Sequence, residues 1–164
     1  MVDIIGYPNY TISEKGEIYS KKRKIIMKQQ INEDGYFQIG LRNNGNKKNF
    51  KVHRLLYQAF KLEIGEEMPN EVDHENGIKT DNSLKNLRGA TSSQNKMNRG
   101  TPITNTSGHK NIDKTKWGTF EVRIMYITRY SKTFKTIEEA IEHRDIKIVE
   151  LHGVFANNGE TINI

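Results

Sequence analysis

The first fifty residues alternate short extended segments with turn signals. Apolar and β-favouring residues occupy 10–12, 16–19 and 36–41, and Gly, Asn and Asp cluster around 14–16, 34–35 and 43–45. Short β-favouring runs bounded by such clusters are typical of strands joined by tight turns. This pattern predicts a small antiparallel sheet.

Residues 52–61 change to a helical period. Leu55, Leu56, Ala59 and Phe60 fall on one stripe of a 3.6-residue repeat. After a polar turn at 65–70, residues 71–77 are expected to be extended and then tightly turned. Thr91 and Gln94 have capping-box spacing, which predicts a helix that starts at Thr91 and carries residues 94–98. The order strand, turn, strand, helix follows the first helix.

A final segment follows a Gly- and Pro-containing linker at 99–107. Alternate apolar positions predict one half-buried strand there: Phe120, Val122, Ile124 and Tyr126. Thr136 and Glu139 form a second capping box, and the apolar stripe after it predicts a helix that ends before Gly153. We expect a sheet backed by this helix.

Composition favours a polyanionic partner. The 164 residues allow one core or several small modules. The net charge of +6 points to nucleic acid, although a membrane surface would also attract it. The chain has no stretch of about 20 apolar residues and no signal-peptide order at its N-terminus. Without cysteine it has no disulfide or thiolate zinc site. We expect a soluble, cytoplasmic protein that does not enter membranes.

Basic residues are dense in the N-terminal segment. Nine of them face only Glu33 and Asp34 between residues 21 and 51: Lys21, Lys22, Arg23, Lys24, Lys28, Arg42, Lys47, Lys48 and Lys51. A nucleic-acid surface and an ordinary solvated surface are both open interpretations of such a run.

Residues 72–95 carry the candidate chemistry. Phosphodiester hydrolysis needs an activated water, neutralisation of phosphate charge and help for the leaving oxygen. His74 can accept the proton of the water, since the ordinary histidine pKa lies near 6.5. Asp73 and the amide of Asn95 suffice for a magnesium ion, which keeps most of its waters. Asp73 and His74 are neighbours on a strand and point to opposite sides, and Asn86 is suited to tie the following loop.

An isolated Asp-His pair is usually a turn or surface feature, but the spacing here is more specific. Asn86-Leu87 follows His74 by twelve residues, and Asn95 then opens a helix. This pattern resembles the HNH nuclease motif. Residues 52–60 are similar to the helix that precedes the motif in phage and intron-encoded homing endonucleases, and residues 81–88 and 90–91 continue the similarity.

The resemblance implies a central ββα-metal (His-Me finger) unit. In it His74 is the general base, Asp73 and Asn95 hold one divalent cation, and Asn86 is structural. Asn95 replaces the final histidine of the motif, which implies a sparse, weakly held metal site and favours Mg²⁺ or Mn²⁺ over zinc. His53 is expected outside the site, and Glu75 is either a reserve ligand or a surface acid.

The flanking segments resemble two further modules. Residues 6–13 and 16–20 are similar to the nuclease-associated modular motif found ahead of HNH domains, without its usual tryptophan. Residues 107–112, 117–120, 132–140 and 151–153 resemble the Apetala or ethylene-response-factor DNA-binding domain. That family lays a three-stranded sheet in the major groove with the helix behind it.

This second resemblance suggests which residues contact DNA. By strand alternation Arg123 faces away from the helix, and lysines before it touch phosphate. The full candidate set adds one arginine of the HNH helix: Lys110, Lys114, Lys116, Trp117, Arg123, Arg129, Lys132 and Arg54. A core position for Trp117 is equally open. The first strand has fewer arginines than the family, so no base preference carries over.

We therefore expect an α+β chain of three modules, 1–50, 51–99 and 106–158. The small N-terminal antiparallel sheet and the C-terminal three-stranded sheet with its helix would flank the HNH unit. The expected function is a monomeric HNH homing-type endonuclease that nicks or breaks double-stranded DNA. Two alternatives stay open: a catalytically inactive, sequence-specific DNA-binding regulator, and a nuclease for structured RNA or junctions.

Overall fold

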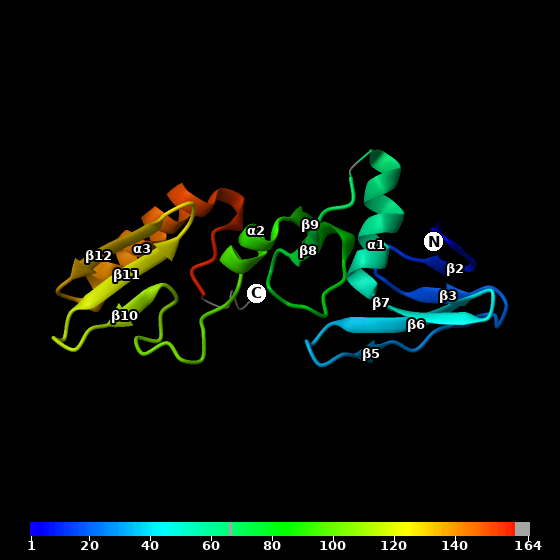
Figure 1. Cartoon of the computed structure of the whole chain (residues 1–164), viewed down its shortest axis with the longest axis horizontal. Helices are drawn as coiled ribbons and strands as arrows, with labels where there is room; N and C mark the ends of the chain where they lie inside the picture. The colour runs from blue at the N-terminus through cyan, green and yellow to red at the C-terminus, as the bar shows by residue number, and fades with distance from the viewer. Residues whose placement is uncertain (66, 160–164) are drawn as a thin grey trace. The chain divides into compact units, whose positions relative to one another are not determined.

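The computed structural model describes residues 1–65 and 67–159. The chain divides into two compact units, Met1–Thr91 and Ser92–Ile164, and each has its own buried apolar cluster. Figure 1 shows the order of the elements along the chain. No helix in the described ranges is long and apolar enough to cross a membrane.

The N-terminal part of the first unit holds two small antiparallel sheets, where the sequence suggested one. The first sheet has the order β1 (Val2–Ile4), β2 (Tyr7–Ile12), β3 (Ile18–Ser20) and β4 (Ile25–Ile26). The second has the order β5 (Gln30–Ile31), β6 (Phe37–Asn43) and β7 (Asn46–Lys51). The chain leaves the first sheet at residues 27–29, where the side chain of Gln29 donates to the carbonyl of Gly16 over 2.6 Å.

Helix α1 (Val52–Lys61) has the predicted bounds and contacts strands of both sheets. Leu55, Leu56 and Ala59 of the predicted stripe are 3% exposed or less and join Ile12, Ile18 and Leu41 in one core. A 3₁₀ turn, η1 (Leu62–Ile64), follows the helix. The apolar stripe of α1 thus packs against sheet residues that are distant in the sequence.

A two-stranded hairpin completes the first unit. Strand β8 (Glu71–His74) pairs with β9 (Leu87–Ala90), and the loop between them contains the 3₁₀ turn η2 (Leu84–Asn86). The antiparallel register sets Asp73 opposite Arg88 and His74 opposite Leu87. Both strands contact α1, so the end of β8 is held against the main core.

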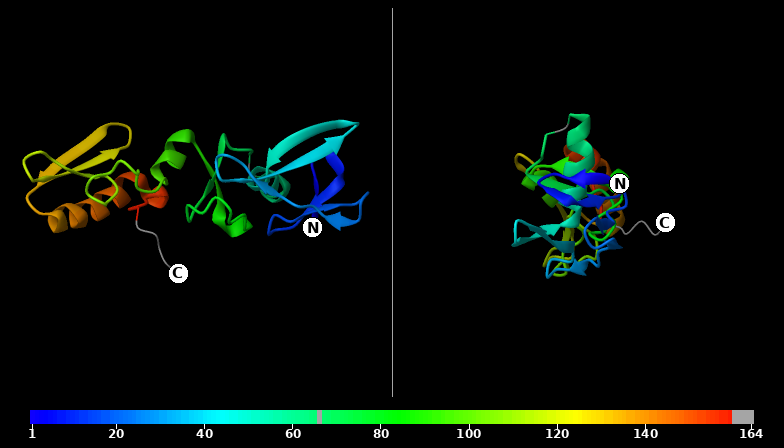
Figure 2. Two further views of the ribbon diagram at one scale, coloured as in Figure 1. Left: turned by 90° about the horizontal axis from the view of Figure 1, so that it is seen from below. Right: turned by 90° about the vertical axis from the view of Figure 1, so that its right-hand side faces the viewer.

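The second unit confirms the predicted sheet backed by a helix. After α2 (Ser92–Met97) come β10 (Ile112–Lys114), β11 (Phe120–Met125) and β12 (Arg129–Phe134), which form an antiparallel sheet in that order. Helix α3 (Ile137–His152) lies along one face of this sheet (Figure 2), and η3 (Gly153–Phe155) follows it. The buried cluster is Ile112, Val122, Ile124, Ala140 and Ile148.

Local signals define α3 well and the end of β11 less well. The Thr136 hydroxyl accepts from the Glu139 amide, and the Glu139 carboxylate accepts from the Thr136 amide, which confirms the capping box. The expected burial of Tyr126 is wrong, because the strand ends at Met125 and residues 126–128 form the turn. Tyr126 is 45% exposed.

Candidate active site and nucleic-acid surface

His74 ends β8 and is almost fully buried, at 3% exposed. Its Nε2 lies 3.0 Å from the side-chain oxygen of Asn82, which is also buried. An amide oxygen only accepts hydrogen bonds, so this contact puts the proton on Nε2 and the basic lone pair on Nδ1. Burial lowers the pKa of His74, against the opposing effect of Asn82 and the nearby carboxylates of Asp73 and Asp81. The imidazole is therefore neutral and suited to accept a proton.

Asp73 is equally buried and is paired across the hairpin. Arg88 Nε and Nη2 both lie 2.9 Å from Asp73 Oδ2, as the register of the two strands requires. The arginine balances the charge of a carboxylate that is only 4% exposed. Arg88 was not among the sequence candidates, although pairing Asp73 across the predicted hairpin could have found it.

The loop after His74 is held by Asn86. Its side-chain oxygen accepts from the Asn76 amide over 3.0 Å, and its side-chain nitrogen donates to the Asp81 carbonyl over 2.8 Å. The Glu75 amide donates to the Asn86 carbonyl. These are the loop hydrogen bonds expected of Asn86. Gly77 adopts a φ of 72° in the tight turn and donates to the His74 carbonyl, and Glu75 itself is exposed.

His53, which the sequence analysis set outside the site, lies beside His74. The two rings are 5.0 Å apart, and the ring of Tyr36 lies 4.9 Å from His53 and 5.8 Å from His74. Burial, with smaller effects of His74, Lys51 and Arg54, lowers the pKa of His53 to about 3. His53 is thus a neutral neighbour of His74. Neither it nor Tyr36 could be placed here from sequence spacing.

Asn95 lies half-buried in α2 of the second unit, whereas Asp73 lies in β8 of the first. Within the described residues no three or more His, Cys, Asp or Glu side chains cluster as metal ligands. A zinc site of the usual kind would need such a cluster. A buried carboxylate such as Asp73 instead suits a hard divalent cation that takes few protein ligands.

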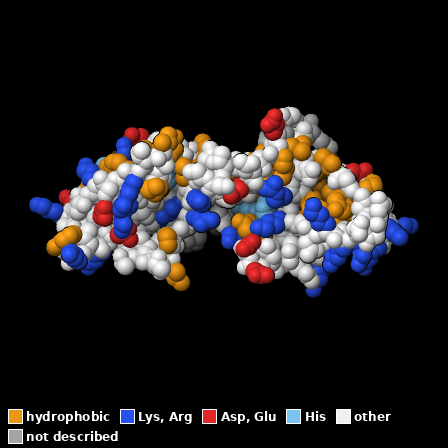
Figure 3. All heavy atoms as spheres, in the orientation of Figure 1, with side chains coloured by type: hydrophobic (Ala, Val, Ile, Leu, Met, Phe, Trp, Pro, Cys, Tyr) orange, Lys and Arg blue, Asp and Glu red, His pale blue; other side chains and the backbone are white. Residues whose placement is uncertain are grey.

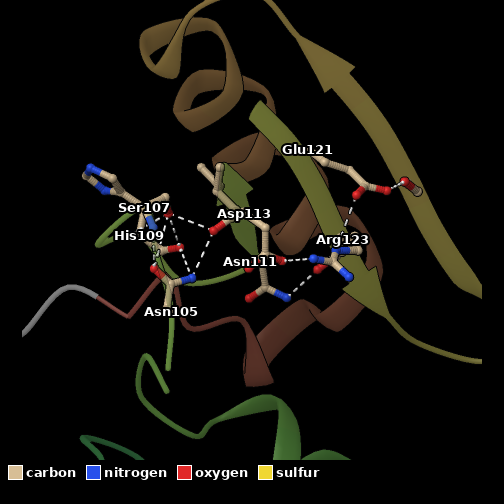
Figure 4. A network of polar contacts seen from close by, with 9 residues as sticks. Asn105, Ser107, His109, Asn111, Asp113, Glu121 and Arg123 are labelled. Carbon is tan, nitrogen blue, oxygen red and sulfur yellow. Dashed lines mark hydrogen bonds and ion pairs between the residues drawn. The ribbon is translucent and has the colours of Figure 1, made fainter. Parts of the chain in front are cut away.

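The C-terminal sheet carries a charged network on the face away from α3. Val122 and Ile124 are buried, so Arg123 between them faces the other side, as strand alternation predicts. Its guanidinium forms an ion pair with Asp113 of β10 and lies 3.5 Å from Glu121 (Figure 4). The Asn111 side chain donates to the Arg123 carbonyl. Two acids therefore neutralise the arginine expected to read DNA.

The other candidates in this sheet are mostly at its surface. Trp117 is 77% exposed in the β10–β11 turn, which excludes the core position for it, and Lys116 Nζ lies 4.7 Å from its ring centroid. Lys114, Arg129 and Lys132 are exposed. Lys132 pairs with Val122 and therefore belongs to the α3 side of the sheet, opposite to the side of Arg123.

Lys110 requires a correction. It was expected to touch phosphate, but it is only 7% exposed and its ammonium donates to the Met97 carbonyl over 2.6 Å. Burial lowers its pKa to about 8. Its charge is therefore engaged inside the unit, because the chain folds it over the end of α2. Arg54 of α1 similarly donates to the Asn70 carbonyl, over 3.0 Å, while staying half-exposed.

Comparison with known proteins agrees with this geometry. The family model described as HNH endonuclease matches residues 50–97, and that described as NUMOD4 motif matches residues 2–42. A solved structure of DNA binding and cleavage by the HNH homing endonuclease I-HmuI is similar, with a TM-score of 0.54 and 30% identity. The match covers 93% of this chain and 90% of that one.

The chain belongs to the HNH endonuclease family. Its α+β architecture with a central HNH-type fold is confirmed by the likeness to the I-HmuI structure. HNH endonucleases generally depend on a divalent metal, which is consistent with the buried carboxylate of Asp73.

Two phage proteins illustrate how far the similarity extends. DNA endonuclease I-HmuI of Bacillus phage SP01 is 42% identical over 118 residues, which is 70% of this HNH chain and 66% of that protein. H-N-H endonuclease F-TflII of Escherichia phage T5 is 36% identical over 81 residues, 49% of this chain and 42% of that protein. The chain thus matches just under two thirds of the first relative's length and less than half of the second's.

Proposed function

We propose that this chain is a metal-dependent endonuclease of homing type that cuts double-stranded DNA as a monomer. The observation that carries the proposal is the buried, neutral His74, whose proton is held on Nε2 by Asn82. Phosphodiester hydrolysis needs a neutral side chain that can accept a proton and, next to it, a carboxylate that can bind a metal ion. The named DNA endonucleases among its relatives support DNA as the substrate.

In the proposed reaction His74 Nδ1 takes the proton of the attacking water. Asp73 and Asn95 would hold one Mg²⁺ or Mn²⁺, which neutralises charge on the phosphate and on the leaving oxygen. Arg88 fixes the orientation of the Asp73 carboxylate, and Asn86 fixes the loop that follows the base. His74 and Asp73 thereby divide proton transfer and charge neutralisation between them.

We assign DNA holding to the C-terminal unit. Its three-stranded sheet with a helix on one face supports the resemblance to the Apetala-type domain. The proposed contacts are the exposed Trp117, Lys116 and Arg129 with Arg123 at the centre. Lys132 and Lys114 pair with Val122 and Phe120 on the α3 side of the sheet, so this surface does not include them. The three-module division at 50 and near 99–106 remains part of this proposal.

The deciding experiment is cleavage of supercoiled plasmid carrying phage DNA. We expect wild type to produce open-circle or linear product in magnesium or manganese and none in chelator. His74→Ala should reduce cleavage by at least about a hundredfold, while DNA affinity stays within a few fold, because only the base is lost. His109→Ala, a histidine of the second unit with no assigned role, is the matched control.

Each failure has a distinct meaning. If wild type binds DNA and never cuts it, the chain is a DNA-binding protein with an inactive nuclease fold. If it cuts only folded RNA or junctions, DNA is not the substrate. If His74→Ala loses affinity as much as activity, His74 serves binding or folding.

A further inference from the structure

A group of side chains next to His74 has no part in the proposed reaction. Tyr36 immediately precedes β6, and its ring packs on the rings of both His53 and His74. The β5–β6 turn fixes its position, because Asn32 accepts from the Tyr36 amide over 2.8 Å and Gly35 adopts a φ of 86°. A residue of the N-terminal sheets therefore stands rigidly beside the candidate base.

Two ammonium groups converge on this tyrosine. Lys51 Nζ lies 4.5 Å and Lys79 Nζ 5.1 Å from the centroid of the Tyr36 ring. Lys51 ends β7, whereas Lys79 belongs to the loop that follows His74. Each contact has cation-π geometry, but two like charges over one ring repel each other unless an anion joins them.

In this structure Asp34 contacts both lysines, Lys51 through its carboxylate and Lys79 through its main-chain carbonyl. Its carboxylate lies 3.1 Å from Lys51 Nζ, and its main-chain carbonyl accepts from Lys79 Nζ over 2.8 Å. The Asp34 side chain is 63% exposed and borders an open hollow of about 430 Å³. An ion pair this exposed contributes little stability. A phosphate offers more acceptor oxygens to both lysines than one carboxylate does and can displace it.

The surroundings of the histidine pair are basic, which suits a phosphate. Figure 3 shows histidine atoms at the surface with Lys and Arg side chains around them. Lys51 Nζ and Lys79 Nζ both lie over the Tyr36 ring, and the centroid of that ring is 5.8 Å from that of the His74 ring. The lysines thus lie on the side of His74 that Tyr36 covers.

We propose that Tyr36, Lys51 and Lys79 form a clamp for a DNA backbone phosphate beside the bond that His74 attacks, with Asp34 as its internal placeholder. This inference rests on the proposed nuclease function. The clamp residues position the substrate: the lysines bind phosphate, and the Tyr36 ring keeps their ammonium groups beside the imidazole. The N-terminal sheets then contribute to the active site itself.

The first test measures duplex-DNA binding in chelator over a range of salt concentrations. Lys51→Ala and Lys79→Gln should each weaken binding and lower the slope of log K against log salt by about 1, because one phosphate contact is lost. Asp34→Ala should act in the opposite direction and bind several-fold more tightly. Tyr36→Phe should behave as wild type, whereas Tyr36→Leu should weaken binding a few fold.

The second test locates the contact. A duplex with one methylphosphonate next to the mapped cut site should bind wild type several-fold more weakly and bind Lys79→Gln no more weakly than the unmodified duplex. The control is Lys22→Ala, which removes an exposed lysine of the β3–β4 turn. The methylphosphonate should weaken binding by this variant as much as binding by wild type. Circular dichroism checks that each variant is folded.

Unchanged salt slopes for both lysine variants would overturn the clamp. Weaker binding by Asp34→Ala, in step with the lysine variants, would overturn the placeholder and make Asp34 a support for the lysines. If the methylphosphonate weakens binding by wild type and by Lys79→Gln equally, Lys79 contacts some other phosphate or none. If wild type never cuts DNA but the slopes change as expected, phosphate binding stands and the nuclease function fails.

Discussion

At the scale of single residues, the first unit buries titratable side chains in two different ways. Asp73 and Arg88 satisfy each other, whereas His53 and His74 are buried as neutral rings. Among the residues that the structure describes, His53 Nδ1 finds no hydrogen-bond partner, which is tolerable for an uncharged imidazole and costly for a charged one. The histidine pair should therefore limit the pH range in which this unit is stable.

The pKa of His53, about 3 in the folded state against about 6.5 in an unfolded chain, gives the sign. Between these values the unfolded state binds more protons, so stability falls as pH decreases. We expect a loss of about 2 kcal/mol between pH 7 and pH 5 from this residue. Urea unfolding at both pH values measures it.

His53→Gln is the control, because its side chain does not titrate. The slope of its unfolding free energy against pH should be smaller than that of wild type, by the equivalent of nearly one bound proton. An identical pH dependence in variant and wild type would show that His53 titrates normally.

At the scale of elements, the strand register decides which side chains meet. The 3.6-residue stripe and the capping box are local signals, so α1 and α3 could be predicted with their bounds. Tyr36 and His74 are far apart in the sequence, and no local pattern encodes their contact. Asp113 and Arg123 meet only through the register of β10 and β11, which the alternation within one strand does not give. Charge alone also misassigned Lys110, since a sequence does not show that a lysine is folded over a helix end.

The open face of the β10–β12 sheet makes a prediction about selectivity. Asp113 and Glu121 neutralise Arg123 in the free sheet, so a duplex bound there as proposed would have to replace their contacts with good acceptors. Asp113→Asn should tighten binding to arbitrary duplexes several-fold and reduce the preference for the specific site. Arg123→Ala should reduce specific binding about tenfold or more and leave the chemistry intact.

Affinity measurements on specific and arbitrary duplexes at one salt concentration test both variants. Unchanged binding by Arg123→Ala would remove this arginine from the interface. A loss of specific and arbitrary binding in equal proportion by Asp113→Asn would mean that Asp113 only supports the fold.

Side chains from elsewhere in the second unit donate to carbonyl groups at the end of α2. Lys110 donates to the Met97 carbonyl, and Asn157 donates to the carbonyl of Asn98 over 2.8 Å. Asn157→Ala should cost about 1 kcal/mol and speed hydrogen exchange at the Asn98 and Arg99 amides. Asn49→Ala, on exposed β7, is the control. Unaltered exchange at those amides would show that α2 is held by other contacts.

At the scale of the whole molecule, two separate apolar cores divide the chain. Each core is built from elements of one unit only. Each unit should therefore unfold in a cooperative transition of its own. We expect differential scanning calorimetry to resolve two transitions. Leu56→Ala should lower the midpoint temperature of only one transition, by several degrees, because it opens a cavity in the first core.

Ile148→Ala is the matched variant for the second core. A single transition that both substitutions shift equally would mean that the two units unfold as one. The sequence suggested three modules, and this measurement counts the cooperative units directly.

The exposed position of Trp117 has a practical consequence. It is the only tryptophan in the chain, and three quarters of its surface is open to water. Its emission should therefore be red-shifted and easily quenched by iodide in the free protein. An indole on the β10–β11 turn thus provides an intrinsic fluorescent reporter: a blue shift and protection from iodide on addition of a duplex would follow occupancy of that surface without any label.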